Sequence, residues 1–332
     1  MTQSIPPTSG AAVPTGSGTP APAPGGLPGG DTAGGGPERG AVRGMSVWGE
    51  AFVRLRRNPA AIIGAAIVAL FLLVAVLAPV IAPYGALALP GRTEVTPTTI
   101  PGPGELAGHP LGLDRFGGDL LSKLIWGAQS SLMIGIVSTG LGLVGGMVLG
   151  LLAGGFGGWV DSLIMRFVDI LLSVPNLLLA VSIAAVLGQG EHAIMVAIGV
   201  SAVPIFARLL RSSMLSQKGS DYVLAAQTLG LSRTTVTMSH LLPNSIGPVI
   251  VQATLTLATA VIDAAALSFL GLGGGVPYEA EWGRMLTYAQ AELGIAPQLA
   301  FLPGLCIAIT ALGFTLLGES LREALDPKSR AR

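Results

Sequence analysis

Six stretches of this chain are long and apolar enough to cross a lipid bilayer. They cover residues 60–82, 132–154, 163–187, 193–210, 249–269 and 299–317. A helix rises about 1.5 Å per residue, so most of these stretches cover the roughly 30 Å of a bilayer's hydrocarbon core. The stretch 193–210 is short, and 163–187 is long enough to tilt. We therefore predict an all-α polytopic membrane protein with six transmembrane helices.

The balance of residue types agrees with this class. Apolar residues make up 51% of the chain and charged residues only 11%, whereas a soluble domain carries about 25% charged residues. The net charge is zero and no long basic run occurs, which argues against a nucleic-acid partner. The single cysteine, Cys306, lies in an apolar run and is interpreted as a packed side chain.

The distribution of basic residues predicts the orientation in the membrane. With the amino terminus inside, only four of the 18 Lys and Arg residues fall outside: Arg92, Arg115, Lys123 and Arg284. Cytoplasmic loops are the ones enriched in Lys and Arg, so both termini are predicted to be cytoplasmic. Residues 48–57 combine apolar side chains with Arg54, Arg56 and Arg57, a pattern typical of an interfacial helix on anionic lipid.

A polar segment between two apolar stretches has the features of a docking helix. Residues 222–229 predict a short helix with Tyr222, Ala225, Ala226 and Leu229 on one apolar face. Gly230 permits the left-handed turn that ends it, and Pro243 suits the first turn of the helix that re-enters the membrane. The basic-residue count places this segment inside.

This segment resembles the EAA loop of ATP-binding cassette (ABC) importer permeases, and five further segments resemble the C-type permease of dipeptide, oligopeptide and nickel importers in the same order. They are 109–128, 154–161, 165–169, 266–273 and 282–286, followed by Leu325-Asp326-Pro327. The resemblance implies a type I ABC importer permease fold. It also implies a sister permease, two cytoplasmic ATPases that bind ATP and Mg, and an extracytoplasmic solute-binding protein.

The same resemblance assigns the coupling residues and the domain organisation. The residues expected to contact an ATPase are Asp221, Tyr222, Leu224, Ala225, Ala226, Gly230, Pro243 and Asn244. The expected parts are a disordered cytoplasmic tail (1–46), an interfacial helix with the first span (47–82), an extracytoplasmic segment (83–130), the transmembrane domain (131–318) with its coupling loop (213–244), and a second cytoplasmic tail (319–332).

Three positions depart from the family pattern. Leu224 stands where a Glu is usual, Gly118 where an Arg is common, and Ala264 where a Glu is usual, with Asp263 beside it. A leucine at position 224 makes the expected ATPase contact more apolar and less dependent on a salt bridge.

Two stripes of residues run along the predicted spans. Gly142, Gly146, Gly150, Gly154 and Gly158 recur every four residues, which indicates close helix packing, with helix sliding during transport as the alternative. Gln252, Thr256, Thr259 and Asp263 share one face of the fifth span. A polar face inside a membrane must meet protein or water, so it lines the substrate pathway or hydrogen-bonds to the sister subunit. Asp169 is expected to pair with Arg166.

Signatures of catalysis and of metal binding are missing from the sequence. It contains no Walker loop, no Gly-x-Ser-x-Gly elbow and no His-Glu-x-x-His, so no catalytic residue, metal ligand or resident cofactor is predicted. His109, His192 and His240 are interpreted as solvated loop residues. The 271–275 glycine run is interpreted as an outer turn.

Outside the membrane, residues 120–128 predict a helix lying in the outer interface, with Trp126 at headgroup depth and Asp119, Ser122 and Lys123 on its polar side. The loop 271–298, with Glu279, Glu281 and Glu292, is expected either to contact the solute-binding protein or to form a solvated cap.

These features favour a non-enzymatic, multi-pass subunit in the cell (inner or plasma) membrane, in contact with lipid, that takes up small peptides by ABC transport. Nickel or another small solute is the alternative cargo. An ion-coupled secondary transporter with Asp263 as its titrating group is a second alternative, which the coupling loop and the lack of an internal repeat disfavour. An intramembrane hydrolase lacks a nucleophile and base pair.

Overall fold

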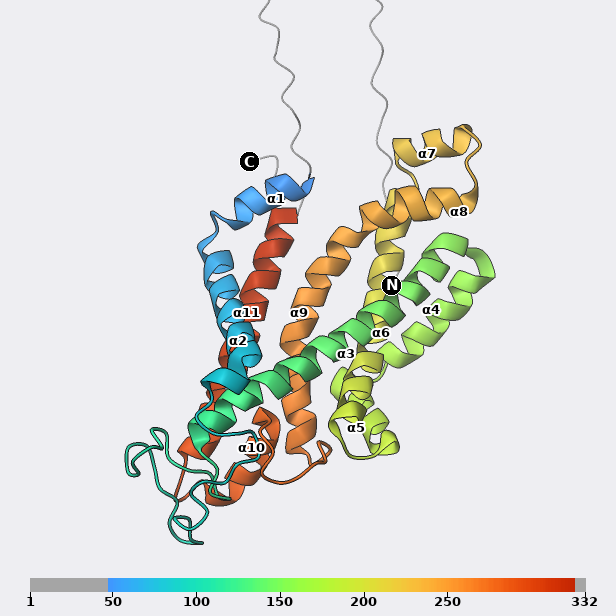
Figure 1. Ribbon diagram of the computed structural model, residues 1–332. Coiled ribbons are helices and arrows are strands. Elements are labelled where there is room, and N and C mark those ends of the chain that lie inside the picture. The colour runs from blue at the N-terminus through green and yellow to red at the C-terminus, as the bar shows by residue number, and fades with distance from the viewer. Residues whose placement is uncertain (1–46, 326–332) are drawn as a thin grey trace, which may run out of the picture. The chain divides into compact units, whose positions relative to one another are not determined.

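The computed structural model describes residues 47–325, and every regular element in that range is a helix (Figure 1). The expectations for 1–46 and for 326–332 lie outside the described residues. The chain begins with α1 (Val47–Leu55), the helix predicted to be interfacial, whose Phe52 and Val53 side chains are exposed. Asn58 then caps the first long helix by accepting a hydrogen bond from the Ala60 N–H.

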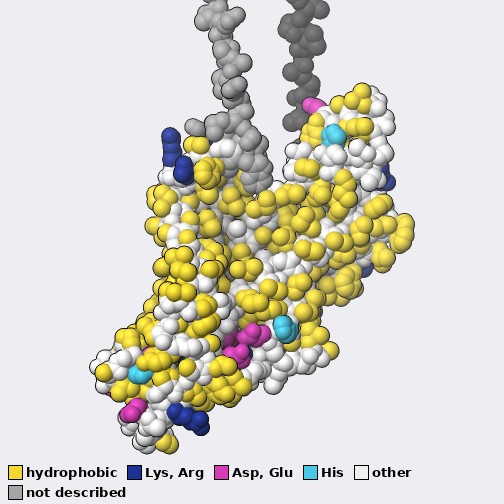
Figure 2. All heavy atoms as spheres, in the orientation of Figure 1, with side chains coloured by type: hydrophobic (Ala, Val, Ile, Leu, Met, Phe, Trp, Pro, Cys, Tyr) yellow, Lys and Arg dark blue, Asp and Glu magenta, His cyan; other side chains and the backbone are white. Residues whose placement is uncertain are grey.

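Long apolar helices account for five of the six predicted spans. They are α2 (Pro59–Ile81), α3 (Leu120–Phe156), α6 (Glu191–Gln217), α9 (Leu242–Phe269) and α11 (Gln298–Leu325). Hydrophobic side chains cover most of the visible face between the two ends of these helices, as expected for a surface in contact with lipid (Figure 2). The all-helical, multi-pass fold is thus confirmed.

The predicted span 163–187 is a bent pair of helices rather than one tilted helix. α4 (Gly158–Leu172) and α5 (Asn176–Leu187) meet at an angle of 92°. Pro175 lies at the break: it has no N–H to donate, and it disfavours the helical conformation at Val174. The length of the apolar stretch was correct, but the proline divides it.

Two helices extend beyond the predicted limits. The expected outer interfacial helix 120–128 is the first part of α3, which runs without interruption from Leu120. Asp119 caps it, its carboxylate accepting from the Ser122 N–H at 2.8 Å. At the other end of the chain, α11 continues to Leu325, so the first residues of the predicted tail are helical.

The glycine stripe brings α3 and α6 into direct backbone contact. Gly142, Gly146, Gly150 and Gly154 all face α6. A Cβ on Gly146 would lie 2.8 Å from the Val203 carbonyl oxygen and closer still to the Phe206 Cβ. Gly158, the fifth predicted member, lies instead in the turn at the start of α4 with φ +61°. The packing interpretation therefore describes four of the five glycines.

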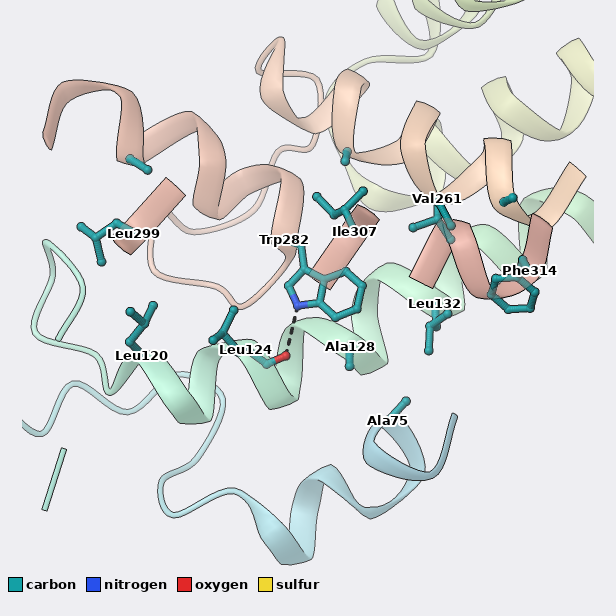
Figure 3. Packing of buried hydrophobic residues seen from close by; sticks show 14 of the residues in the cluster. Ala75, Leu120, Leu124, Ala128, Leu132, Val261, Trp282, Leu299, Ile307 and Phe314 are labelled. Carbon is teal, nitrogen blue, oxygen red and sulfur yellow. Dashed lines mark hydrogen bonds between the residues drawn. The ribbon is translucent and has the colours of Figure 1, made fainter. Parts of the chain in front are cut away.

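A second core surrounds Trp282, the first residue of α10 (Trp282–Ala289) (Figure 3). The indole is fully buried against α3, and its Nε1–H donates to the Leu124 carbonyl oxygen at 3.1 Å. Phe71 of α2 meets the ring edge to face, with 5.7 Å between ring centroids. One side chain thus joins α2, α3 and α10 near the end of the bundle opposite α1.

Replacing Gly146 with alanine should destabilise the chain because its Cβ meets α6 backbone that cannot move aside. We expect the free energy of unfolding to fall by about 1–3 kcal/mol, the usual effect of overpacking. Thermal unfolding of the purified chain in detergent, followed by size-exclusion chromatography, measures the loss. Gly140→Ala is the matched control, because a Cβ there has nothing within 4 Å; equal melting temperatures would contradict the packing argument.

Candidate functional site

The predicted docking helix is α7 (Asp221–Thr228), a short helix that follows α6 after a tight turn. It lies at the same end of the molecule as α1 (Figure 1). The Tyr222 hydroxyl donates to the Gln217 side-chain oxygen at 2.8 Å, and the Ser220 hydroxyl donates to the Gln217 carbonyl oxygen at 2.6 Å. These bonds fix the direction in which α7 leaves α6.

One residue of α7 faces the opposite way from the prediction. Val223 and Ala226 are buried against Met214, Val236 and other apolar side chains of the same chain. The predicted apolar face is therefore wrong for Ala226, because the helix needs an inward face to stay attached. Tyr222, Leu224, Ala225 and Leu229 are exposed, Leu229 to 82% and Leu224 to 50%.

Gly230 ends α7 in the left-handed conformation that the sequence predicts, with φ +78°. Its N–H donates to the Gln227 carbonyl oxygen at 2.9 Å, and the Leu231 N–H donates back to Ala226 at 3.2 Å. This pair of bonds is the Schellman motif, which satisfies the last carbonyl groups of a helix and turns the chain sharply.

The next helix, α8 (Arg233–Val236), is attached to the end of α3 by one side chain. Arg233 donates from Nε to the Gly155 carbonyl oxygen at 3.2 Å and from Nη2 to that of Phe156. Both acceptors belong to the last turn of α3, whose carbonyl groups lack partners within the helix. Arg233 therefore ties α8 to the end of α3. No spacing or motif in the sequence pointed to this contact of Arg233.

Pro243 and Asn244 lie where a π-helical turn, η1 (Thr237–Leu241), joins α8 to α9. Pro243 has no N–H to donate, and its ring would clash with a backbone carbonyl in the preceding turn of a regular α-helix. The wider π turn accommodates the ring and the missing hydrogen bond. The Asn244 side-chain amide donates to the His240 carbonyl oxygen at 2.7 Å. Pro243 thus lies in the first turn of α9, as predicted.

Two ion pairs hold α4 against α6. Arg211 forms a bidentate pair with Asp161, with 2.6 Å between Nη2 and Oδ2, and Arg208 pairs with Asp169. The predicted Arg166–Asp169 pair is wrong, because α6 presents an arginine to Asp169 across the helix interface. Such a contact between helices cannot be inferred from spacing within one helix.

The polar stripe of α9 is divided between internal contacts and the surface. Thr256 is buried and takes a hydrogen bond from the Gln252 amide at 3.3 Å, whereas Thr259 is exposed and its hydroxyl donates to the Thr256 carbonyl oxygen at 3.0 Å. The Asp263 carboxylate accepts from Asn176 of α5 at 3.3 Å. Thr259 is thus the exposed member of the stripe, and Gln252 and Asp263 are half-buried.

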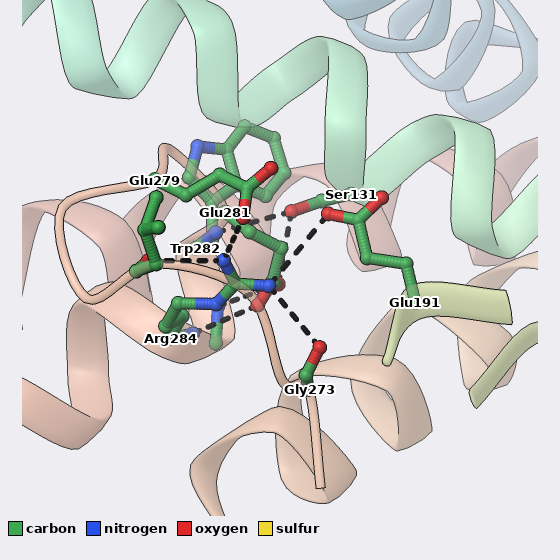
Figure 4. Close-up of polar contacts among 9 residues, drawn as sticks. Ser131, Glu191, Gly273, Glu279, Glu281, Trp282 and Arg284 are labelled. Atoms are coloured by element: carbon green, nitrogen blue, oxygen red, sulfur yellow. Dashed lines mark hydrogen bonds and ion pairs between the residues drawn. The ribbon is translucent and has the colours of Figure 1, made fainter. Parts of the chain in front are cut away.

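At the opposite end, a buried polar network surrounds Arg284 (Figure 4). Its guanidinium pairs with Glu279, approaches Glu191 of α6 at 3.7 Å and donates to the Gly273 carbonyl oxygen at 3.3 Å. Glu281 is fully buried and caps α10, accepting from the Gly283 and Arg284 N–H groups at 2.8 Å.

The three acidic residues of loop 271–298, expected in a contact with a solute-binding protein or in a solvated cap, all have partners within the chain. Glu279 and Glu281 belong to the polar network around Arg284, and Glu292 pairs with Arg115 at 3.3 Å. The 271–275 glycine run is a turn, as interpreted, with positive φ at Gly271, Gly274 and Gly275.

A second buried group corrects the interpretation of His109. The imidazole stacks on Tyr84, and its Nδ1 lies 2.9 Å from the Asp119 carboxylate, which also accepts from the Ser122 hydroxyl. His109, Ser122 and Lys123 are all buried because the segment before α3 folds over them. Lys123 donates to the Ala86 carbonyl oxygen at 3.0 Å. His192 is exposed, as expected, and His240 is half-buried.

The described residues do not provide the arrangement that a metal site requires. Among the described residues, no group of three or more His, Cys, Asp or Glu side chains is placed to hold a metal ion. The polar groups around Arg284 and His109 are occupied in contacts within the chain. The accessible features are the exposed face of α7 and, on the α9 stripe, Thr259.

The fold is that of an ABC transporter permease. A crystal structure of the inward-facing MetNI methionine ABC transporter superposes with a TM-score of 0.51 at 21% identity, covering 61% of this chain and 96% of that one. The family model for the binding-protein-dependent transport system inner membrane component matches residues 146–331. Residues 46–90 match the N-terminal TM domain of oligopeptide transport permease C.

The chain belongs to the family of binding-protein-dependent transport system inner membrane components. It is 40% identical over 288 residues to the dipeptide transport system permease protein DppC of Alkalihalophilus pseudofirmus, covering 86% of this chain and 92% of that protein. It is also 40% identical to the glutathione transport system permease protein GsiD of Escherichia coli, over 85% of this chain and 90% of that one. The chain is therefore a multi-pass membrane transport subunit and not an enzyme.

Removing the Glu281 carboxylate should loosen the end of the bundle that contains α10. Glu281→Ala leaves two buried N–H groups without an acceptor, so we expect the free energy of unfolding to fall by about 2–4 kcal/mol. The melting temperature of the purified chain reports the change. Glu94→Ala, in the exposed part of the same end, is the control; a loss no greater than that of the control would show that Glu281 is not a buried cap.

Proposed function

We propose that this chain is the permease subunit of an ATP-driven importer of short peptides and that α7 receives the movement of cytoplasmic ATPases. The observation that carries the proposal is the exposed apolar face of α7, formed by Tyr222, Leu224, Ala225 and Leu229 on a helix whose other side is fixed to the chain. Such a face fits a groove on a partner protein. Membership of a transport family supports an ATPase as that partner.

The orientation follows from the arrangement of charges and ends. α1, α7 and the last turns of α11 lie at one end of the molecule (Figure 1), and this end carries Arg54, Arg56, Arg57, Arg233 and Arg322. An excess of basic residues marks the cytoplasmic side. The loop 83–119 and α10 then face outward, where a solute-binding protein delivers its cargo.

The rigid connections within the chain suggest how coupling proceeds. Closure of two ATPases displaces α7, and Arg233 transmits this displacement to the end of α3. α3 in turn moves with α6, because the glycine stripe leaves no space between them. Tilting of this pair against α9 and the sister permease switches the pathway between outward-open and inward-open populations.

Short peptides are the cargo that the relatives favour. DppC is named for dipeptide transport and GsiD for glutathione, itself a tripeptide. Nickel or another small solute is the alternative within the same class of importer. In our proposal Gln252, Thr256, Thr259 and Asp263 line one side of the pathway, with Thr259 and Asp263 in contact with the solute.

Gly230→Val should abolish ATP-driven uptake while leaving the chain folded in the membrane. A β-branched residue at φ +78° is strained by about 1–3 kcal/mol, and relief of the strain turns α7 away from its partner. Uptake of a labelled dipeptide into proteoliposomes that contain the full importer measures the effect, with labelled nickel as the alternative cargo. Gly219→Val is the control, because that glycine has no positive φ and nothing within 4 Å of its Cβ position.

Disulfide crosslinking then locates the defect. In a Cys306→Ser background, a cysteine at position 224 should crosslink to the ATPase subunit and one at the buried position 223 should not. Normal transport by the Gly230→Val variant together with an absent crosslink from position 224 would overturn the coupling role of α7.

The pathway proposal predicts unequal thiol labelling along α9. In the same Cys306→Ser background, Thr259→Cys should react with a small water-soluble thiol reagent, and its rate should change at least severalfold when ATP is added. Thr256→Cys should react at least about tenfold more slowly, since that side chain is only 6% exposed. Protection of position 259 in every nucleotide state would favour burial against the sister permease instead.

A further inference from the structure

A hollow at the junction of α3, α7 and α8 forms a basic pocket in which a second cation, Lys218, lies beside Arg233. It has a volume of about 400 Å³ and is lined by Gly155, Lys218, Gln227, Leu231, Arg233, Val236 and Thr237. These residues come from the end of α3, the turn after α6, and the α7–α8 segment. We call the hollow lined by these seven residues the basic pocket.

The two cations of the basic pocket have no anionic partner in residues 47–325. Lys218 forms no ion pair there, and Arg233 donates only to the uncharged carbonyl oxygens of Gly155 and Phe156. Asp161, whose negative charge acts on Lys218, is bidentately bound by Arg211. The pocket therefore carries an uncompensated positive charge.

This positive charge disfavours protonation of Lys218. Burial lowers the pKa of Lys218, and the neighbouring charge of Arg233 lowers it further, while Asp161 opposes the shift only in part. A bound anion would offset that effect. Gln227 and Thr237 add polar side chains that suit a ligand with several oxygen atoms.

The surroundings of the basic pocket are those of the membrane surface. Large apolar side chains are exposed near it: Phe156 at the end of α3, Trp159 at the start of α4, and Leu231 in the pocket wall. Exposed aromatic residues at helix ends mark the headgroup level of a bilayer. Basic pockets between helices on the cytoplasmic side are suited to anionic lipid headgroups.

We propose that the basic pocket binds a phosphate group through Lys218 and Arg233, and that an anionic phospholipid of the inner leaflet supplies it. The bound headgroup would neutralise both cations and lie between the coupling helix and the end of α3. Lipid composition would then influence how firmly α7 and α8 are held. A soluble phosphate is the second source of the same chemistry, which the test separates from the first.

The test uses the full-length chain in nanodiscs of phosphatidylcholine with a minor fraction of phosphatidylglycerol. After the chains are released from the nanodiscs, native mass spectrometry counts those that retain a phosphatidylglycerol molecule. We expect Lys218→Gln to lower this fraction roughly fivefold to tenfold, because one charge-assisted contact is lost. Lys218→Arg should retain the lipid. Arg322→Gln, which removes an exposed charge from the end of α11, should behave like the unmodified chain.

A second arm identifies the source of the phosphate. The same chain in pure phosphatidylcholine nanodiscs is titrated with inorganic phosphate, and binding that depends on Lys218 without any lipid preference would assign the site to a soluble anion. Equal phosphatidylglycerol retention by Lys218→Gln and Arg322→Gln, with no phosphate binding, would overturn the proposal. Neither arm requires the ATPases, so failure here would leave the proposed import function untouched.

Discussion

The rest of the structure depends on the contact between α3 and α6. Four glycines remove every side chain from one face of α3, so that the two backbones meet and α6 residues fill the space that side chains would occupy. This contact sets the position of α4, which ion pairs hold to α6, and of α7, which follows α6 directly. In a membrane, where no hydrophobic force brings helices together, such close van der Waals packing is a main source of association.

The two ends of this helix pair carry different kinds of polar contact. At one end, a polar network around Arg284 and Glu281 joins α3, α6, α10 and the turn after α9. At the other end, α7 presents apolar side chains outward, and Arg233 ties α8 to α3. Polar contacts within the chain thus hold one end together, whereas the other end exposes an apolar surface.

The proposed lipid site lies beside this contact of Arg233. A phosphate in the basic pocket would neutralise Lys218 and Arg233 at the point where Arg233 ties α8 to α3. The charge of the surrounding leaflet would then influence how firmly α7 and α8 are held. Further along α9, Thr259 is the exposed polar group of the proposed solute pathway, and Asp263 is half-buried.

The sequence by itself determined five of the six spans, four of the five glycine contacts and the turn at Gly230, because each depends on local spacing or on the conformational freedom of one residue. The family followed from the resemblance of several motifs in one order. Only the tertiary structure decided which polar side chains are buried and with what they pair. Asp169 meets Arg208 and not Arg166, His109 and Lys123 are covered by the segment before α3, and Ala226 turns inward. These pairings join residues distant in the chain, and no periodicity within one helix specifies which neighbour a side chain will face.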